Sequence, residues 1–252
     1  MPDLRLISAD VLKLRRRRGM LAVALLCTLG ITALAFGVSA LQHSGNPGKY
    51  APAGGLKSYQ DALEVIGLLM LVAGSIIGAT AGTQDVESGV FRDLAATGRS
   101  RTSLFLSRVV GACAVSVPIA AVTAAFAAGA CLLFAGDATK LDAGALASGT
   151  ALLLAAMAFS TIVAVGVSAL VGSRGPVIGI LLGFFLAIQP VLVAIGFLGV
   201  VREVVPSAAL HRIGDLPSPP VALGLGTAIA GLVLWSVVAV GAGAWRTRTS
   251  EL

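Results

Sequence analysis

Six long apolar runs dominate this sequence, and they restrict its fold more than any other feature. A bilayer core about 30 Å thick requires about 20 apolar residues in helical form, because the backbone finds no water there. A single acidic side chain, Glu64, lies within the runs. The sequence therefore predicts an all-α protein with six transmembrane helices, over residues 19–41, 62–82, 109–135, 146–171, 176–200 and 221–244.

The composition agrees with a polytopic membrane protein. Hydrophobic residues make up 57% of the chain and charged residues 12%, which is far from the composition of a soluble domain. Alternating segments of about 10 residues, which are typical of a transmembrane β-barrel, do not occur. We expect a single transmembrane domain over residues 1–252.

Lysine and arginine are divided unevenly between the two sides of the predicted membrane. One side holds 13 of them: Arg5, Lys13, Arg15, Arg16, Arg17, Arg18, Arg92, Arg99, Arg101, Arg108, Arg174, Arg246 and Arg248. The other side holds five: Lys49, Lys57, Lys140, Arg202 and Arg212. Connections rich in lysine and arginine stay on the cytoplasmic side, so both termini are predicted to be cytoplasmic. The predicted location is the cell (cytoplasmic) membrane. The net charge of +6 follows from this sorting, so we do not expect a nucleic acid partner.

The segment before the first run has the pattern of an amphipathic helix. Leu4, Ile7, Val11 and Leu14 share one face over residues 4–18, which predicts a helix in the membrane interface with cations on its other face, near anionic headgroups. The alternative is an irregular positive anchor. A second alternative is a cleavable signal peptide, but the first run exceeds the 7 to 15 or so apolar residues of such signals. We expect the first span to remain uncut.

The sequence offers no group for catalysis, metal binding or nucleotide binding. His43 and His211 are isolated in outer connections, and Lys49, which follows a glycine, is followed by Tyr50 rather than by the Ser or Thr of a phosphate-binding loop. We therefore expect no catalytic residue, cofactor or metal ion in this chain. Apart from Glu64, at the outer edge of the second run, the runs lack acidic and histidine side chains, which also argues against a proton-coupled transporter.

The connection over residues 83–108 is the one compact polar cluster. Asp85, Glu87 and Ser88 would suit the start of a short helix near Val90. Phe91 and Leu94 would form its apolar face, Gly98 would end it, and Ser100 would cap the next helix. Such a short cytoplasmic helix presents side chains to a soluble partner. The alternative is a solvated loop that reverses the chain.

This connection resembles the signature of the type-2 permease class of ATP-binding cassette (ABC) exporters. That family shows an acid two residues before a glycine, then apolar positions, a proline, Ser-Arg and a lysine seven residues on. The sequence departs from it at Val90, Gly98 and Arg108, where the family has Thr, Pro and Lys. Glycine still interrupts a helix, and arginine keeps the charge. The matching residues are Glu87, Gly89, Leu94, Ser100, Arg101 and Arg108.

The resemblance implies a permease subunit that works with a separate ABC ATPase. The partners would be that ATPase, which holds ATP and Mg²⁺, a second copy or a paralogous permease, and membrane lipids. The apolar spans suit a hydrophobic, amphipathic or lipid-linked substrate. The alternatives are a non-transporting anchor or sensor for a cytoplasmic partner, and a secondary transporter. The predicted contacts to the ATPase are Glu87, Gly89, Phe91, Arg92, Leu94, Gly98, Ser100 and Arg101.

The fifth run contains a polar residue and a proline near its middle. An amide facing lipid at that depth is costly, so Gln189 should face protein or a substrate pathway. Pro190 lacks the amide hydrogen and should kink the span. The hypothesis is a substrate pathway along Gln189 and Pro190, and the alternative is a hydrogen bond from Gln189 to a neighbouring helix of the same subunit.

Three further patterns concern packing and the outer connections. Gly78 and Gly82, and likewise Gly175, Gly179 and Gly183, are four residues apart, a spacing that permits close helix packing in lipid. Residues 43–60 are predicted to form an irregular loop without a site. A short helix is predicted over residues 202–211, where it would dip into the outer leaflet.

Overall fold

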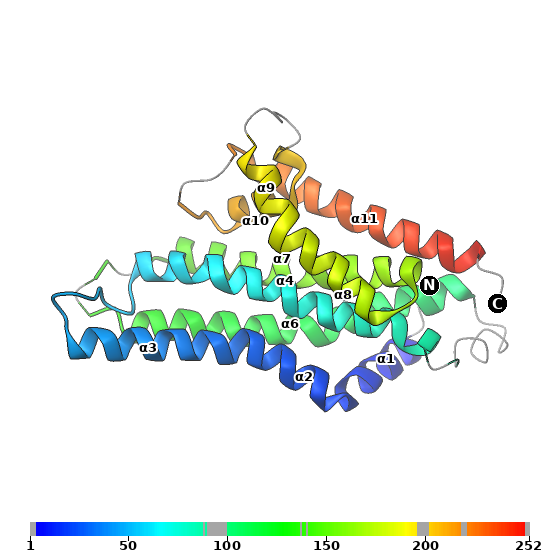
Figure 1. Ribbon diagram of the computed structural model, residues 1–252, viewed down its shortest axis with the longest axis horizontal. Helices are drawn as coiled ribbons and strands as arrows, with labels where there is room; N and C mark the ends of the chain where they lie inside the picture. The colour runs from blue at the N-terminus through cyan, green and yellow to red at the C-terminus, as the bar shows by residue number, and fades with distance from the viewer. Residues whose placement is uncertain are drawn as a thin grey trace.

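The computed structural model of the chain describes residues 4–87, 89, 100–136, 138–139, 141–195, 202–217 and 221–249, and no strand occurs among them. The helices are α1 (Leu4–Arg16), α2 (Arg18–Leu25), the π-helix η1 (Leu26–Gly30), α3 (Ile31–Gly45), α4 (Leu56–Glu87), α6 (Arg101–Leu133), α7 (Ala143–Val171), α8 (Arg174–Leu182), the π-helix η2 (Gly183–Ile188), α9 (Gln189–Ala194), α10 (Pro206–Ile213) and α11 (Leu225–Thr249) (Figure 1).

Six helical segments are long and apolar enough to cross a membrane, so the predicted all-α fold with six transmembrane helices is confirmed. The segments are Arg18–Gly45, Leu56–Asp85, Arg101–Leu133, Ala143–Val171, Arg174–Ala194 and Leu225–Thr249. Helix α4 continues to Glu87 and α6 begins at Arg101, so both ends of the predicted connection 83–108 are helical.

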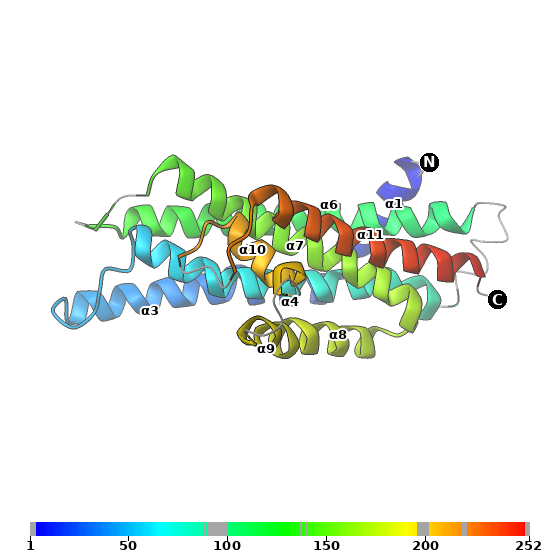
Figure 2. The same cartoon turned by 90° about the horizontal axis from the view of Figure 1, so that it is seen from above.

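Both ends of the chain approach the same end of the bundle. The last turn of α4, the first turns of α6 and α8, and the last turn of α11 lie there, beside α1 (Figure 1). We call it the basic end, because Arg101, Arg108, Arg174, Arg246 and Arg248 lie on these helix ends. Seen from above, α8 and α9 run along one flank of the bundle, and α1 and α6 lie toward the other (Figure 2).

The core is centred on the packing of α4 against α7. Glycines at positions 74, 78 and 82 of α4 face α7, and a Cβ atom added at Gly78 would collide with the Thr161 carbonyl. The close packing expected from Gly78 and Gly82 is thus observed. No described residue outside the helix itself lies within 4 Å of a Cβ placed at Gly175, Gly179 or Gly183, so the second glycine series makes no close packing contact in the described part of the chain.

Side chains and glycine define the ends of the long helices. Ser100 accepts a hydrogen bond from the Ser103 amide at 3.2 Å, which confirms the predicted cap of α6. Asp142 accepts one from the Ala145 amide at 2.8 Å at the start of α7. Helix α7 ends at Gly172, whose φ of 77° is a left-handed conformation that glycine adopts without strain.

The fifth span and the connection after it differ from the prediction in their bounds. The span ends at Ala194 rather than at residue 200, and residues 196–201 lie outside the described part of the chain. Its π-helix η2 directly precedes Gln189 and Pro190, where proline removes a backbone donor. The predicted short helix over residues 202–211 is displaced to Pro206–Ile213, because Pro206 fits the first helical position.

Candidate functional site at the basic end of the bundle

Asp85 lies in the last turn of α4 and binds cations from two other helices. The Lys13 ammonium on α1 lies 3.2 Å from Asp85 Oδ1, and the Arg108 guanidinium on α6 lies 3.0 Å from Asp85 Oδ2. Asp85 and Arg108 are each only 6% exposed. A carboxylate buried to this degree requires a charged partner, so the two pairs hold the ends of α1, α4 and α6 together.

A second contact strengthens the attachment of α1. The Ser107 hydroxyl on α6 donates a hydrogen bond to Asp10 Oδ2 on α1 at 2.8 Å. Asp10 also lies 3.5 Å from the Lys13 ammonium, so it orients the cation that reaches Asp85. Helix α1 is therefore fixed to the bundle by polar side chains as well as by the buried Leu14. We call Asp10, Lys13, Asp85, Ser107 and Arg108 the ionic cluster.

A hydrogen bond from the fifth span to Glu87 attaches the end of α4 to the start of that span. Its Oε1 accepts a hydrogen bond from the Arg174 amide at 2.9 Å, in the first turn of α8. The free amides of a helix N-terminus favour a carboxylate there. Gly89 follows with a φ of 73° and an exposed position, a conformation that glycine adopts readily. The carboxylate predicted to contact the ATPase therefore bonds to α8 in this chain.

The remaining predicted ATPase contacts divide into two groups. Ser100 and Arg101 lie at the start of α6, where Ser100 is exposed and Arg101 is partly exposed. Phe91, Arg92, Leu94 and Gly98, and with them the predicted short helix, lie outside the described residues. The described residues thus frame the predicted contact surface from both sides.

The ionic cluster was not predicted from the sequence. Lys13 was expected among the cations on the other face of the interface helix, near the headgroups, and its ammonium bonds to Asp85 on α4. Solvent exposure also falls along the apolar face of α1, from 81% at Leu4 to 2% at Leu14. One signal was present in the sequence: Asp10 and Lys13 are three residues apart, so they share a helix face with Leu14.

Gln189 is fully buried and bonds to α10. Its Oε1 accepts a hydrogen bond from the Ser207 amide at 2.9 Å, in the first turn of α10. Its Nε2 has no partner among the described residues. Pro190 is exposed. This hydrogen bond within the subunit is the contact that the structural alternative requires, while the pathway role of Gln189 and Pro190 stays a prediction.

The same region holds the pair His211 and Glu64. His211 Nε2 on α10 lies 3.6 Å from Glu64 Oε1 on α4. Burial lowers the pKa of His211, and the Glu64 carboxylate acts in the opposite direction. Helix α10 is thus attached to the fifth span through Gln189 and to the second span through Glu64.

Comparison with known proteins gives the family. The model of the ABC-2 family transporter proteins matches residues 6–190, which include α1, the ionic cluster and most of the fifth span. The chain therefore belongs to the ABC-2 family of membrane transporter proteins, and it is a multi-pass membrane permease. No curated protein matches the chain in a comparison of sequences.

Proposed function

We propose that this chain is the membrane-spanning subunit of an ABC exporter. It would move a hydrophobic, amphipathic or lipid-linked substrate across the cytoplasmic membrane, with ATP and Mg²⁺ bound by a separate ATPase subunit. The observation that carries the proposal is the family match over residues 6–190, which includes the ends of α4, α6 and α8 at the basic end. A second copy or a paralogous permease would complete the pathway.

The basic end is proposed to face the cytoplasm and the ATPase. The division of 13 to five lysine and arginine residues supports this orientation. The contact surface would consist of residues 88–101 together with Glu87, which accepts a hydrogen bond from the Arg174 amide at the start of α8. Phe91 and Leu94 would supply the apolar anchors of the interface.

The ionic cluster is proposed to transmit the motion of the ATPase into the membrane. When the ATPase subunits close on ATP, residues 88–101 would shift and move the ends of α4 and α6. Arg108 and Lys13 connect these ends to each other and to α1, and Glu87 connects them to α8. A movement of one helix end would then displace all four helices together, which biases the bundle between two arrangements.

The test of this proposal is co-purification of an ATPase. The double substitution Phe91→Asp/Leu94→Asp should abolish co-purification while the chain still inserts, because charges replace both apolar anchors. The matched control is Leu133→Asp/Phe134→Asp, which changes the same residue types at exposed positions at the C-terminal end of α6, opposite the basic end. Full recovery of the ATPase with the first variant would remove residues 88–101 from the interface. Absence of any ATPase with the wild-type chain would favour the anchor or sensor.

A further inference from the structure

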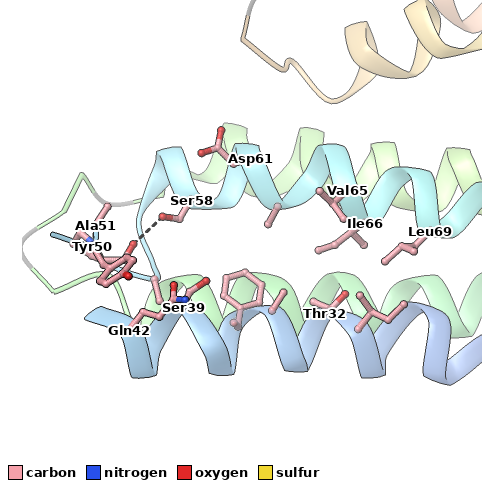
Figure 3. A pocket seen from close by; sticks show the side chains of 16 residues that line it. Thr32, Ser39, Gln42, Tyr50, Ala51, Ser58, Asp61, Val65, Ile66 and Leu69 are labelled. Carbon is pink, nitrogen blue, oxygen red and sulfur yellow. Dashed lines mark hydrogen bonds between the residues drawn. The ribbon is translucent and has the colours of Figure 1, made fainter. Parts of the chain in front are cut away.

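A cavity of about 410 Å³ lies between α3 and the first half of α4, at the end of the bundle opposite the ionic cluster (Figure 3). This volume falls within the range of about 300–1,000 Å³ that is typical of small-molecule sites. Residues 50–53 of the loop between the two helices close one end of the cavity. The sequence analysis predicted no site in this loop.

The loop is held in place by hydrogen bonds, so the cavity is a built feature of the fold. The Ser58 hydroxyl donates to the Pro52 carbonyl at 2.9 Å, and His43 Nδ1 lies 2.7 Å from the Tyr50 carbonyl. These contacts attach the loop to the first turn of α4 and to the last turn of α3.

The lining changes from polar to apolar along the cavity. The end near the loop carries Ser39, Gln42 and Tyr50. The side chains of Ser39 and Gln42 form no hydrogen bond within the described part of the chain. The deeper part is lined by Ile31, Phe36, Val65, Ile66 and Leu69, and Ile66 and Leu69 point from α4 toward α3 (Figure 3).

The depth of the cavity matches one leaflet of a bilayer. Eleven residue steps separate Ile31 from Gln42, which correspond to about 16 Å along a helix. Half of a bilayer core is about 15 Å thick. The first span, Arg18–Gly45, has 28 residues and is therefore about 42 Å long, close to the full bilayer thickness of about 40–45 Å with its headgroups. The polar end of the cavity thus lies at the level of the headgroups.

The cavity opens toward lipid. Ile31 and Val65 line it and are nevertheless 38% and 56% exposed, and in a transmembrane helix an exposed apolar side chain faces hydrocarbon. An empty apolar cavity forfeits van der Waals contacts, and water in its deeper part would find few polar partners. A hydrocarbon chain from the bilayer satisfies both conditions.

A lysine lies beside the polar end of the cavity. The Lys49 ammonium lies 5.4 Å from the centre of the ring of Tyr50, which lines the cavity. The carboxylate of Asp61 is directed away from α3 and does not face this end (Figure 3). The Lys49 ammonium suits the phosphate that a phospholipid headgroup carries.

We propose that this cavity binds one acyl chain of a phospholipid from the surrounding bilayer. The chain lies between α3 and α4, and the headgroup lies at the mouth beside Gln42 and Lys49. This site is independent of the proposed ATP-driven export, because it requires only the membrane-embedded fold.

The test is native mass spectrometry of the full chain with phosphatidylethanolamine. The wild type should retain one phosphatidylethanolamine. Ala62→Phe fills the cavity and should reduce this retention at least tenfold, whereas the control Ala230→Phe, at an exposed position on α11, should leave it unchanged. Lys49→Gln should weaken retention about two- to fivefold, as expected for an exposed charge pair.

Photocrosslinking of the wild-type chain provides a readout that needs no variant. Phosphatidylethanolamine with a diazirine in its acyl chain should label residues 31–42 and 61–69. Labelling confined to other segments would overturn the proposal, as would equal retention of the lipid by the wild type and by Ala62→Phe. The proposal would also be overturned if the wild type formed a dimer without bound lipid and Ala62→Phe dissociated that dimer. A second copy of the chain would then occupy the cavity.

Discussion

Removal of the Asp85 charge is predicted to destabilise the protein strongly. Asp85→Asn leaves the Arg108 guanidinium buried, at 6% exposure, without its carboxylate partner 3.0 Å away. Lys13 is less affected, because it is more exposed and retains Asp10 at 3.5 Å. Breaking one partner out of a buried ion pair costs about 3–5 kcal/mol.

This free energy corresponds to a large change in melting temperature. For a chain of about 250 residues, each 1 kcal/mol shifts the Tm by about 2–4 °C, so Asp85→Asn should lower it by about 6–20 °C. The measurement is thermal unfolding in detergent with a fluorogenic thiol reagent, which reports exposure of the buried Cys131. The control Arg248→Ala, at an exposed position on α11, should shift the Tm by about 2 °C or less.

A double variant separates the charge from the packing. Asp85→Leu/Arg108→Met replaces the pair with apolar side chains and should recover much of the lost stability, because the buried Arg108 charge is removed together with the carboxylate that binds it. If Asp85→Asn has the same Tm as the control Arg248→Ala, the ionic cluster does not hold α1, α4 and α6 together. The proposed transmission through it would then be wrong.

Three further predictions concern packing, pH and topology. Gly78→Leu should prevent close packing of α4 on α7 and lower the yield of folded protein, whereas Gly179→Leu, at an open position, should be tolerated; equal yields would contradict the packing account. The pKa of His211 is lowered in the folded protein, so the unfolded chain binds the proton more readily, and stability should decline as the pH falls below about 6.5. Thermal unfolding measured from pH 7 to pH 5 should show this decline for the wild type and not for His211→Gln. Cysteines introduced by Ser44→Cys and Ser218→Cys should react with an impermeant thiol reagent in intact cells, and Ser250→Cys should not; labelling of the last would reverse the proposed orientation.

The helices of this protein follow from local sequence, and for that reason they could be predicted. Each apolar run must satisfy its own backbone hydrogen bonds in lipid, so its length alone indicates a spanning helix. The cap at Ser100 and the packing glycines Gly78 and Gly82 are also local signals. The predicted bounds differed at the basic end because α4 and α6 continue beyond their apolar parts.

The contacts between distant residues could not be predicted in the same way. Lys13 and Asp85 are 72 positions apart, and Asp10 and Ser107 are 97 apart, so no periodic pattern connects them. The partner of Gln189 could not be chosen from the sequence, because a substrate pathway and a neighbouring helix would both keep its amide away from lipid. Its observed partner, the Ser207 amide, belongs to a short helix whose bounds differ from the predicted ones. The cavity depends on how the loop after α3 folds back, which composition does not determine.

An ABC ATPase bound at the basic end is proposed to drive this permease. The most direct test is ATP hydrolysis in proteoliposomes that contain this chain and the ATPase that co-purifies with it, compared with the same preparation of Phe91→Asp/Leu94→Asp. We predict hydrolysis that depends on the wild-type chain and is lost in the variant. Transport driven by an ion gradient in the absence of ATP, or hydrolysis that is unchanged in the variant, would contradict the account.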